Sequence, residues 1–194
     1  MSAQKNHISC EIEQHDGALH DVFLVINGRK IEKTFFDHIA LVAAFGVDLA
    51  AIDVLTCNCG NAGCAGYFDP LIIETRESQV IWHCIGECEK HLGAGQYVFD
   101  KETYSSDIDA LQNLLLARIA DGVRLPLLMD YAFDDDDEEY DVHLDLAGTV
   151  AELRENYRSE GYQAYAWRLK RHYVDGEPWP DHDDDQDEAE ASHL

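Results

Sequence analysis

The sequence predicts an α+β domain in which an antiparallel sheet, built from a meander and hairpins, packs against helices. Three observations lead to this class. Short runs of alternating apolar and polar residues fill the first part of the chain, Asn27-Gly28 marks a two-residue hairpin, and the run from Ser105 to Gly122 has helical spacing. At 194 residues and 46% hydrophobic, the chain can bury the core of one sizeable domain.

The first thirty residues have the pattern of a three-stranded meander. Every second residue of ISCEIE, starting at Ile8, is less polar than its neighbours, as in a strand with one buried face. The segment VFLVINGRKIEKTF folds back at Asn27-Gly28, which places Leu24 opposite Ile31.

A short helix and a second hairpin are expected next. Asp37 is placed to cap a helix over residues 38–46, and residues 52–55 (IDVL) are typical of a short strand. The runs PLIIET and SQVIWHC are rich in β-branched residues and are separated by a tight polar turn near residues 76–78. We expect these two runs to form a hairpin.

The following segment predicts one more strand and the clearest helix. QYVFDKETY is a strand candidate, and Ser105 or Ser106 can cap the helix that Gly122 ends. This helix should lie on the sheet, through the apolar face formed by Ile108, Leu111, Leu115 and Ile119.

Residues 144–174 should form a helix pair or a kinked helix. Apolar residues recur at helical spacing, and Gly161 interrupts the pattern. The two stripes are Leu146, Val150, Leu153 and Tyr157, then Tyr162, Tyr165, Leu169 and Tyr173. Five basic residues here are expected to pair with the acidic run DDDDEEYD: Arg154, Arg158, Arg168, Lys170 and Arg171.

The predicted organisation is one domain followed by a tail. Residues 1–174 form the α+β domain, which contains a zinc-knuckle-like segment at 56–91. Residues 175–194 combine high charge with few apolar side chains, so a disordered acidic tail is expected there.

The hydropathy, the first ten residues and the cysteine content predict the cellular compartment of the protein. The chain has no stretch of about 18 apolar residues, and its first ten residues lack the basic-then-apolar pattern of a signal peptide. We therefore predict a cytoplasmic protein without membrane contacts. Its six cysteines should stay reduced, which favours metal ligands or buried side chains over disulfides.

The charge balance predicts a basic protein as the partner. Fourteen Lys and Arg stand against thirty-nine Asp and Glu, a formal net charge of −25. Such a field repels nucleic acids and anionic membranes and attracts positively charged proteins, including toxins and nucleases. The residues expected to contact the partner are Asp134, Asp135, Asp136, Asp137, Glu138, Glu139, Tyr140 and Asp141.

The run CNCGNAGC predicts a structural zinc site. Zn²⁺ takes four thiolate or imidazole ligands in a tetrahedron, and a short glycine-bearing loop lets neighbouring sulfur atoms converge. Gly60 and Gly63 provide that freedom to Cys57, Cys59 and Cys64. Free thiols and a redox or catalytic centre are the other interpretations of this run.

The fourth ligand is expected from the second hairpin. If that hairpin turns as predicted, Cys84 lies opposite Leu71, near the base of the hairpin and a few residues from the cysteine run. His83, Cys88 and His91 are alternatives for this position.

Two local resemblances follow from these residues. CNCGNAGCAGYF resembles the post-SET zinc motif of SET-domain lysine methyltransferases, which implies that Cys57, Cys59 and Cys64 bind a structural zinc with a distant cysteine. The other elements of that family are missing, so methyltransferase activity is not implied. Residues 56–66 with the VIW of 80–82 are also similar to small uncharacterised bacterial proteins with a CxCGxxGCAG motif, a resemblance that implies no activity.

Together these features predict a non-enzymatic acidic protein that binds and inhibits a basic partner, as an immunity (antitoxin) protein neutralises a bacterial toxin. A DNA mimic that inhibits a nucleic-acid-binding enzyme is an alternative with the same charge requirement. A zinc- or thiol-dependent enzyme of unrecognised type is an alternative of another class. The sequence has no phosphate-binding loop, nucleophile elbow, His-Glu-x-x-His or dinucleotide fingerprint.

Overall fold

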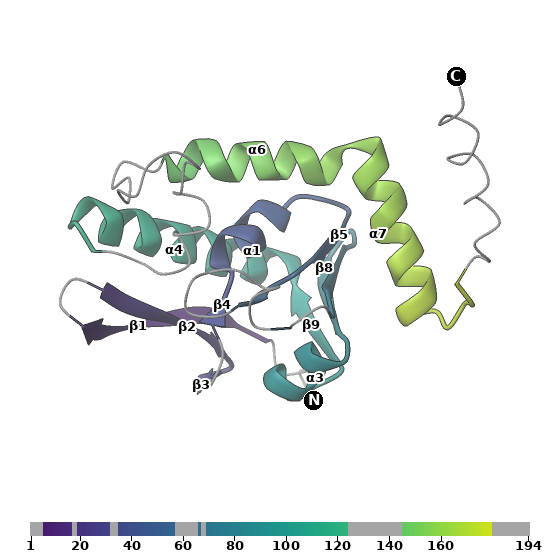
Figure 1. The fold of residues 1–194 in the computed structure, drawn as a ribbon, viewed down its shortest axis with the longest axis horizontal. Coiled ribbons are helices and arrows are strands. Elements are labelled where there is room, and N and C mark those ends of the chain that lie inside the picture. Colours follow the sequence, from purple (N-terminus) through teal and green to yellow (C-terminus); the bar gives the residue numbers. More distant parts are fainter. Residues whose placement is uncertain are drawn as a thin grey trace, which may run out of the picture.

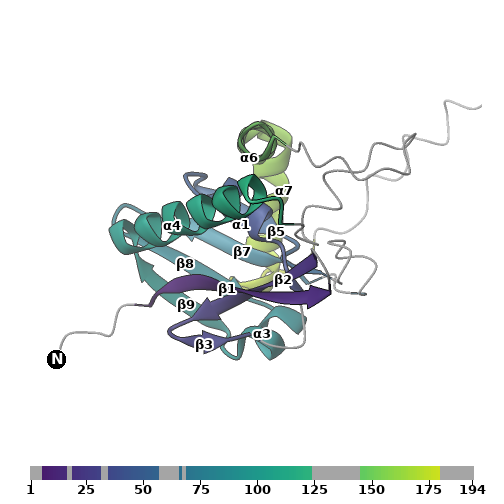
Figure 2. The same ribbon diagram turned by 90° about the vertical axis from the view of Figure 1, so that its left-hand side faces the viewer.

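The chain has an α+β fold, as predicted, in which antiparallel strands form three sheets within the described residues (Figure 1). Helices pack against these sheets (Figure 2). The computed structural model describes residues 6–16, 19–31, 35–56, 66, 69–123 and 145–179. The cysteine run at 57–64, the acidic run at 134–141 and the residues from 180 onward lie outside the described part.

The N-terminal sheet is the predicted meander. It contains β1 (Ile8–Asp16), β2 (Leu19–Ile26) and β3 (Arg29–Lys30), in that order. Asn27 and Gly28 have φ angles of 54° and 76°, which is the left-handed backbone that a tight hairpin turn requires. The amide of Ile31 donates to the Leu24 carbonyl at 2.8 Å, so the predicted register is confirmed.

A short buried helix follows the meander. Helix α1 (His38–Ala44) begins after β4 (Phe35–Phe36), and the Asp37 carboxylate accepts a hydrogen bond from the Ala40 amide at 2.8 Å, which confirms the predicted cap. Every residue of α1 is buried. This helix therefore lies inside the fold, with no solvent-facing stripe.

The main sheet has four strands in the order β5-β7-β8-β9. Its hairpin of β7 (Leu71–Thr75) and β8 (Gln79–Cys84) was predicted, and β9 is Gln96–Asp100. The prediction of one strand over 52–55 was wrong, because these residues are shared between β5 (Leu49–Ile52) and β6 (Leu55–Thr56), which belong to different sheets. Strand β5 is buried throughout, so it lacks the alternation that identifies a half-exposed strand.

Two helices frame β9. Helix α3 (Glu87–Leu92) precedes the strand and α4 (Lys101–Ala120) follows it directly. The predicted cap at Ser105 or Ser106 was wrong, because the Asp100 carboxylate accepts from the Thr103 amide at 3.1 Å and starts α4 earlier. The predicted apolar face is buried at three of its four positions, Ile108, Leu111 and Leu115.

The largest buried cluster among the described residues contains Trp82 of β8. The Trp82 indole is 0% exposed, donates to the Tyr104 hydroxyl at 3.2 Å, and has its ring centroid 5.0 Å from that of Phe99. The ring of Phe36 is nearly parallel to the indole at 6.4 Å. Residues from β4, β8, β9 and α4 thus meet at one side chain, which ties the main sheet to α4 and to the rest of the core.

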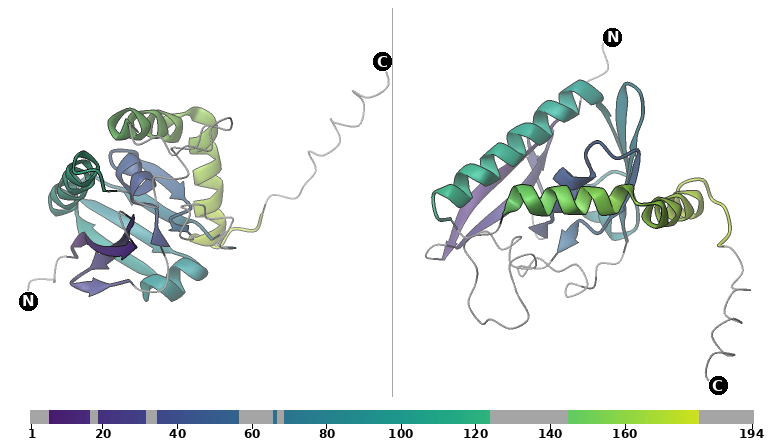
Figure 3. Two further views of the ribbon diagram at one scale, coloured as in Figure 1. Left: turned by 60° about the vertical axis from the view of Figure 1, so that its left-hand side comes forward. Right: turned by 90° about the horizontal axis from the view of Figure 1, so that it is seen from above.

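Two C-terminal helices complete the described fold. Helices α6 (Leu146–Arg158) and α7 (Glu160–Tyr173) run in clearly different directions, so the predicted helix pair is confirmed (Figure 3). The break falls at Ser159 instead of Gly161, because the Ser159 hydroxyl accepts from the Tyr162 amide at 3.3 Å and caps α7.

Side chains from the helix pair hold it on the fold. Arg154 donates to the carbonyls of Val42 and Ala43 at 3.0 and 3.3 Å, at the C-terminal end of α1, where a cation is favoured. The Tyr162 hydroxyl donates to the Ala51 carbonyl at 2.6 Å and accepts from the Ala51 amide at 3.1 Å. It therefore covers part of the free edge of β5.

We predict that Tyr104→Phe lowers the free energy of unfolding by about 1–3 kcal/mol, because the buried indole N–H of Trp82 loses its acceptor. Urea unfolding followed by near-UV circular dichroism measures this change. Tyr173→Phe is the matched control, since Tyr173 is 41% exposed and should leave the stability nearly unchanged. Equal stabilities for Tyr104→Phe and wild type would contradict the role assigned to this hydrogen bond.

Candidate functional site

Two buried cysteines lie where the main sheet meets α3. Cys84 ends β8 and pairs with Leu71 of β7, which is the register predicted from the sequence. Its side chain is 4% exposed and belongs to the same cluster as Trp82, because alternate residues of a strand point to one face. Cys88 is the second residue of α3 and is 0% exposed.

Asp69 joins this pair to the chain that follows the cysteine run. The Cys88 thiol donates to the Asp69 carbonyl at 3.3 Å, and the Asp69 carboxylate accepts from the Glu87 amide at 3.0 Å. Gly86 has a φ of +51°, and a Cβ at this position would overlap the Asp69 carboxylate. A glycine is therefore required for α3 to come this close to Asp69.

The environment raises the pKa of both thiols. Burial, with a smaller contribution from Glu89, raises the pKa of the Cys84 thiol to about 12. Burial also raises the pKa of Cys88, and Cys84, Asp69, Asp53 and Glu87 add to this shift. At neutral pH both thiols are therefore protonated and poor nucleophiles, unless a cation stabilises the thiolates.

The two histidines among the predicted ligands have contacts of their own. His83 points to the opposite face of β8, where its Nε2 lies 3.3 Å from a Glu74 carboxylate oxygen and its Nδ1 lies 3.4 Å from the Gln96 amide nitrogen. Burial lowers the pKa of His83, and Glu74 opposes the shift. His91 lies in α3 with its Nε2 3.8 Å from a Glu87 oxygen.

The described residues alone contain no group of three or more His, Cys, Asp or Glu side chains that could hold a metal ion. Cys57, Cys59 and Cys64 lie outside the described residues, as do the expected partner contacts, Asp134, Asp135, Asp136, Asp137, Glu138, Glu139, Tyr140 and Asp141. Among the described residues, Cys84 and Cys88 belong to one buried cluster and Cys84 helps to raise the pKa of Cys88, whereas His83 points to the other side of the sheet.

A buried histidine was missed by the sequence analysis. His38 is 0% exposed, and among the described residues neither ring nitrogen has a hydrogen-bond partner of normal geometry. Burial lowers its pKa to about 4, and the nearby backbone of Phe36 opposes the shift only partly. The hydroxyl of Thr56, which directly precedes the cysteine run, is also buried and has no partner within the part of the chain that the structure describes. A single histidine in an apolar helix does not show, from the sequence alone, that its ring is buried.

Comparisons of this chain with models of protein families, with curated proteins and with solved structures found no match. Within the described residues, no helix combines the length and apolar character needed to cross a membrane.

We predict that His38 makes the protein less stable in mild acid. Its folded pKa of about 4 is below the ordinary histidine value of 6.5, so the stability it contributes is complete above pH 6.5 and is lost as the pH falls toward 4. The loss should approach about 3 kcal/mol. Urea unfolding of wild type and His38→Leu at several pH values measures it.

The His38→Leu variant should lose less stability than wild type between pH 7 and 4.5. His7→Gln serves as the control, because the His7 side chain is 60% exposed. Parallel pH profiles for wild type and His38→Leu would show that His38 does not cause this acid sensitivity.

Proposed function

We propose that this chain is a non-enzymatic interaction protein of the bacterial cytoplasm that binds and inhibits a basic partner, as an immunity protein neutralises a toxin. The net charge of −25 is the observation that carries the proposal. A potential of this size and sign speeds association with a positively charged surface and disfavours nucleic acids and anionic membranes.

The charge of the described residues supports this proposal. They contain twenty-three acidic and eleven basic side chains. Several of the basic side chains are used within the fold: Arg154 binds the end of α1, Arg158 donates to the Gly46 carbonyl, and Arg76 pairs with Glu74. The folded body therefore has the same sign of charge as the acidic run at 134–141.

The run from Asp134 to Asp141 is the proposed contact surface. It combines seven carboxylates with Tyr140, an aromatic side chain of the kind enriched where interfaces derive their binding energy. Carboxylates give fast, salt-sensitive association, whereas a tyrosine contributes apolar contact area. A basic toxin or nuclease fits both properties.

We also propose that Cys57, Cys59, Cys64 and Cys84 hold a structural zinc ion. Asp69, five residues after Cys64, contacts Cys88, which follows Cys84 by four residues, so the donor types near the run suit zinc. Zinc would stabilise the thiolates that burial otherwise disfavours. A site closed by four thiolates would hold the loop and leave no coordination position for a substrate.

Partner binding should depend on the acidic run. Full-length tagged protein is used to recover the partner from its host, and mass spectrometry identifies it. We expect D134N/D135N/D136N/D137N to weaken binding to this partner by about tenfold or more, mainly through slower association. Surface plasmon resonance with purified proteins measures both rates.

A matched variant with four neutralised tail residues, D183N/D184N/D185N/D187N, controls for the lower net charge and should weaken binding less. Equal losses for the two variants would place the contact elsewhere. Displacement of the protein from its partner by added duplex DNA would favour the DNA-mimic alternative.

The zinc proposal predicts about one zinc per chain in protein purified without chelator. Cys57→Ser and Cys84→Ser should remove the metal and lower the free energy of unfolding by about 3 kcal/mol or more, whereas Cys10→Ser should keep the metal. Elemental analysis and urea unfolding measure the two effects.

If Cys84→Ser retained zinc and Cys88→Ser lost it, Cys88 would be the fourth ligand. Metal-free protein of unchanged stability would contradict the structural role of the ion.

A further inference from the structure

Most of the large apolar side chains that are exposed in the described residues lie on α7 and the segment after it. Five such side chains are exposed, and only Leu116 lies elsewhere. Their exposed fractions are 43% for Tyr165, 47% for Trp167, 41% for Tyr173 and 44% for Trp179. We call Tyr165, Trp167, Arg168, Arg171, His172 and Trp179 the α7 surface.

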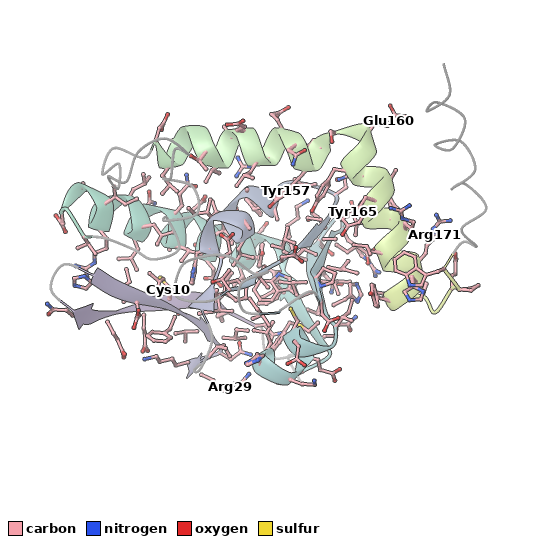
Figure 4. The ribbon with its side chains drawn as sticks, viewed as in Figure 1. Cys10, Arg29, Tyr157, Glu160, Tyr165 and Arg171 are labelled. Carbon is pink, nitrogen blue, oxygen red and sulfur yellow. The ribbon has the colours of Figure 1, made fainter. Side chains whose placement is uncertain are left out.

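This surface also differs in charge from the rest of the protein. The Arg168 guanidinium lies 5.8 Å from the ring centroid of Tyr165 and forms no ion pair within the described part of the chain. Arg171 approaches Glu177 only to 3.9 Å, with both side chains more than half exposed, and it points away from the sheet (Figure 4). Among the described residues, the Arg168 guanidinium is therefore available for a carboxylate, and Arg171 is held only by one long, exposed ion pair that a second carboxylate can join.

The chain folds back along α7 where the helix ends. Gly176 has a φ of +75°, and the amide of Glu177 donates to the Arg171 carbonyl at 2.9 Å. Trp179 stacks on His172, with ring centroids 4.3 Å apart and planes inclined by 29°. Arg168 and His172 are four residues apart and are therefore neighbours on the helix surface. The stacking of Trp179 on His172 thus brings the end of the described chain close to Arg168.

The sequence beyond Trp179 has the opposite charge to this surface. Seven acidic residues occur between Asp181 and Glu190. The eleven residues from 180 to 190 can span about 35 Å when extended, whereas the fourteen residues of α7 are about 21 Å long. The acidic tail is therefore long enough to follow the whole helix from the point where the described chain ends.

We propose that the α7 surface is a binding site for the chain's own acidic tail, residues 181–190. Carboxylates of the tail pair with Arg168 and Arg171, and its backbone covers Trp167. The contact needs no regular structure in the tail, because attachment next to the site gives it a high effective concentration. It is driven by charge, so salt weakens it.

This contact separates the roles of the two acidic segments. A tail held on α7 is less accessible to a basic partner than the run at 134–141. The binding of the tail is independent of the proposed inhibitor function, since it concerns residues of the free chain only.

Tryptophan quenching tests the proposal in the full-length chain. Trp82 is 0% exposed, so in a Trp179→Phe background acrylamide quenching reports mainly on Trp167. We expect D183N/D184N/D185N/D187N to raise the Stern–Volmer constant about twofold, because the indole loses its cover. R168Q/R171Q should raise it equally, and combining the two sets should add nothing further.

The matched control is D134N/D135N/D136N/D137N, which removes the same charge and should leave quenching unchanged. High salt should bring wild type to the value of the tail variant. The proposal is overturned if neither the tail nor the arginine variant changes quenching, or if the control variant changes it instead. Quenching that falls with protein concentration would assign the surface to a second copy and equally overturn it.

Discussion

The burial of one tryptophan holds the described fold together. Trp82 lies in the third strand of the main sheet, and the groups that enclose its indole come from β4, β9 and α4. These elements are far apart in sequence, so none of them can complete the core alone. The hydrogen bond from the indole to Tyr104 also fixes the orientation of α4, because a buried N–H without an acceptor is costly.

Side chains of the same strand, β8, point alternately to the two faces of the main sheet. Trp82 and Cys84 point into the main core, whereas His83 lies beside Ile72 on the opposite face of the sheet, where Ala166 and Leu169 of α7 pack. This alternation has a chemical consequence, since the two adjacent ligand candidates, His83 and Cys84, cannot serve one metal ion. On the α7 side, the positive charge of Lys170 lowers the pKa of both His83 and Glu74. On the other side, Cys84 contributes to the raised pKa of Cys88.

Local chemistry made much of the fold predictable. The Asn27-Gly28 turn, the Asp37 cap and the pairing of Leu71 with Cys84 follow from turn, cap and hairpin rules. Long-range packing decided the rest. Strand β5 has no alternation because both of its faces are buried, and Tyr165 fits the apolar stripe of α7 yet is 43% exposed. For the candidate site, the sequence predicted the types of ligand residue and the pairing of Cys84 with Leu71. It did not predict which of these side chains share one face of the sheet.

The charge and the folded core therefore have separate roles. The core around Trp82 provides a folded body, and in the function proposed above the carboxylates at its surface and in its acidic run attract a basic partner. The most direct test is the affinity of the wild-type chain for its purified partner between about 0.05 and 0.5 M salt. A steep fall in affinity with slower association is the predicted result. An affinity that is unchanged or increased by salt would contradict the proposal.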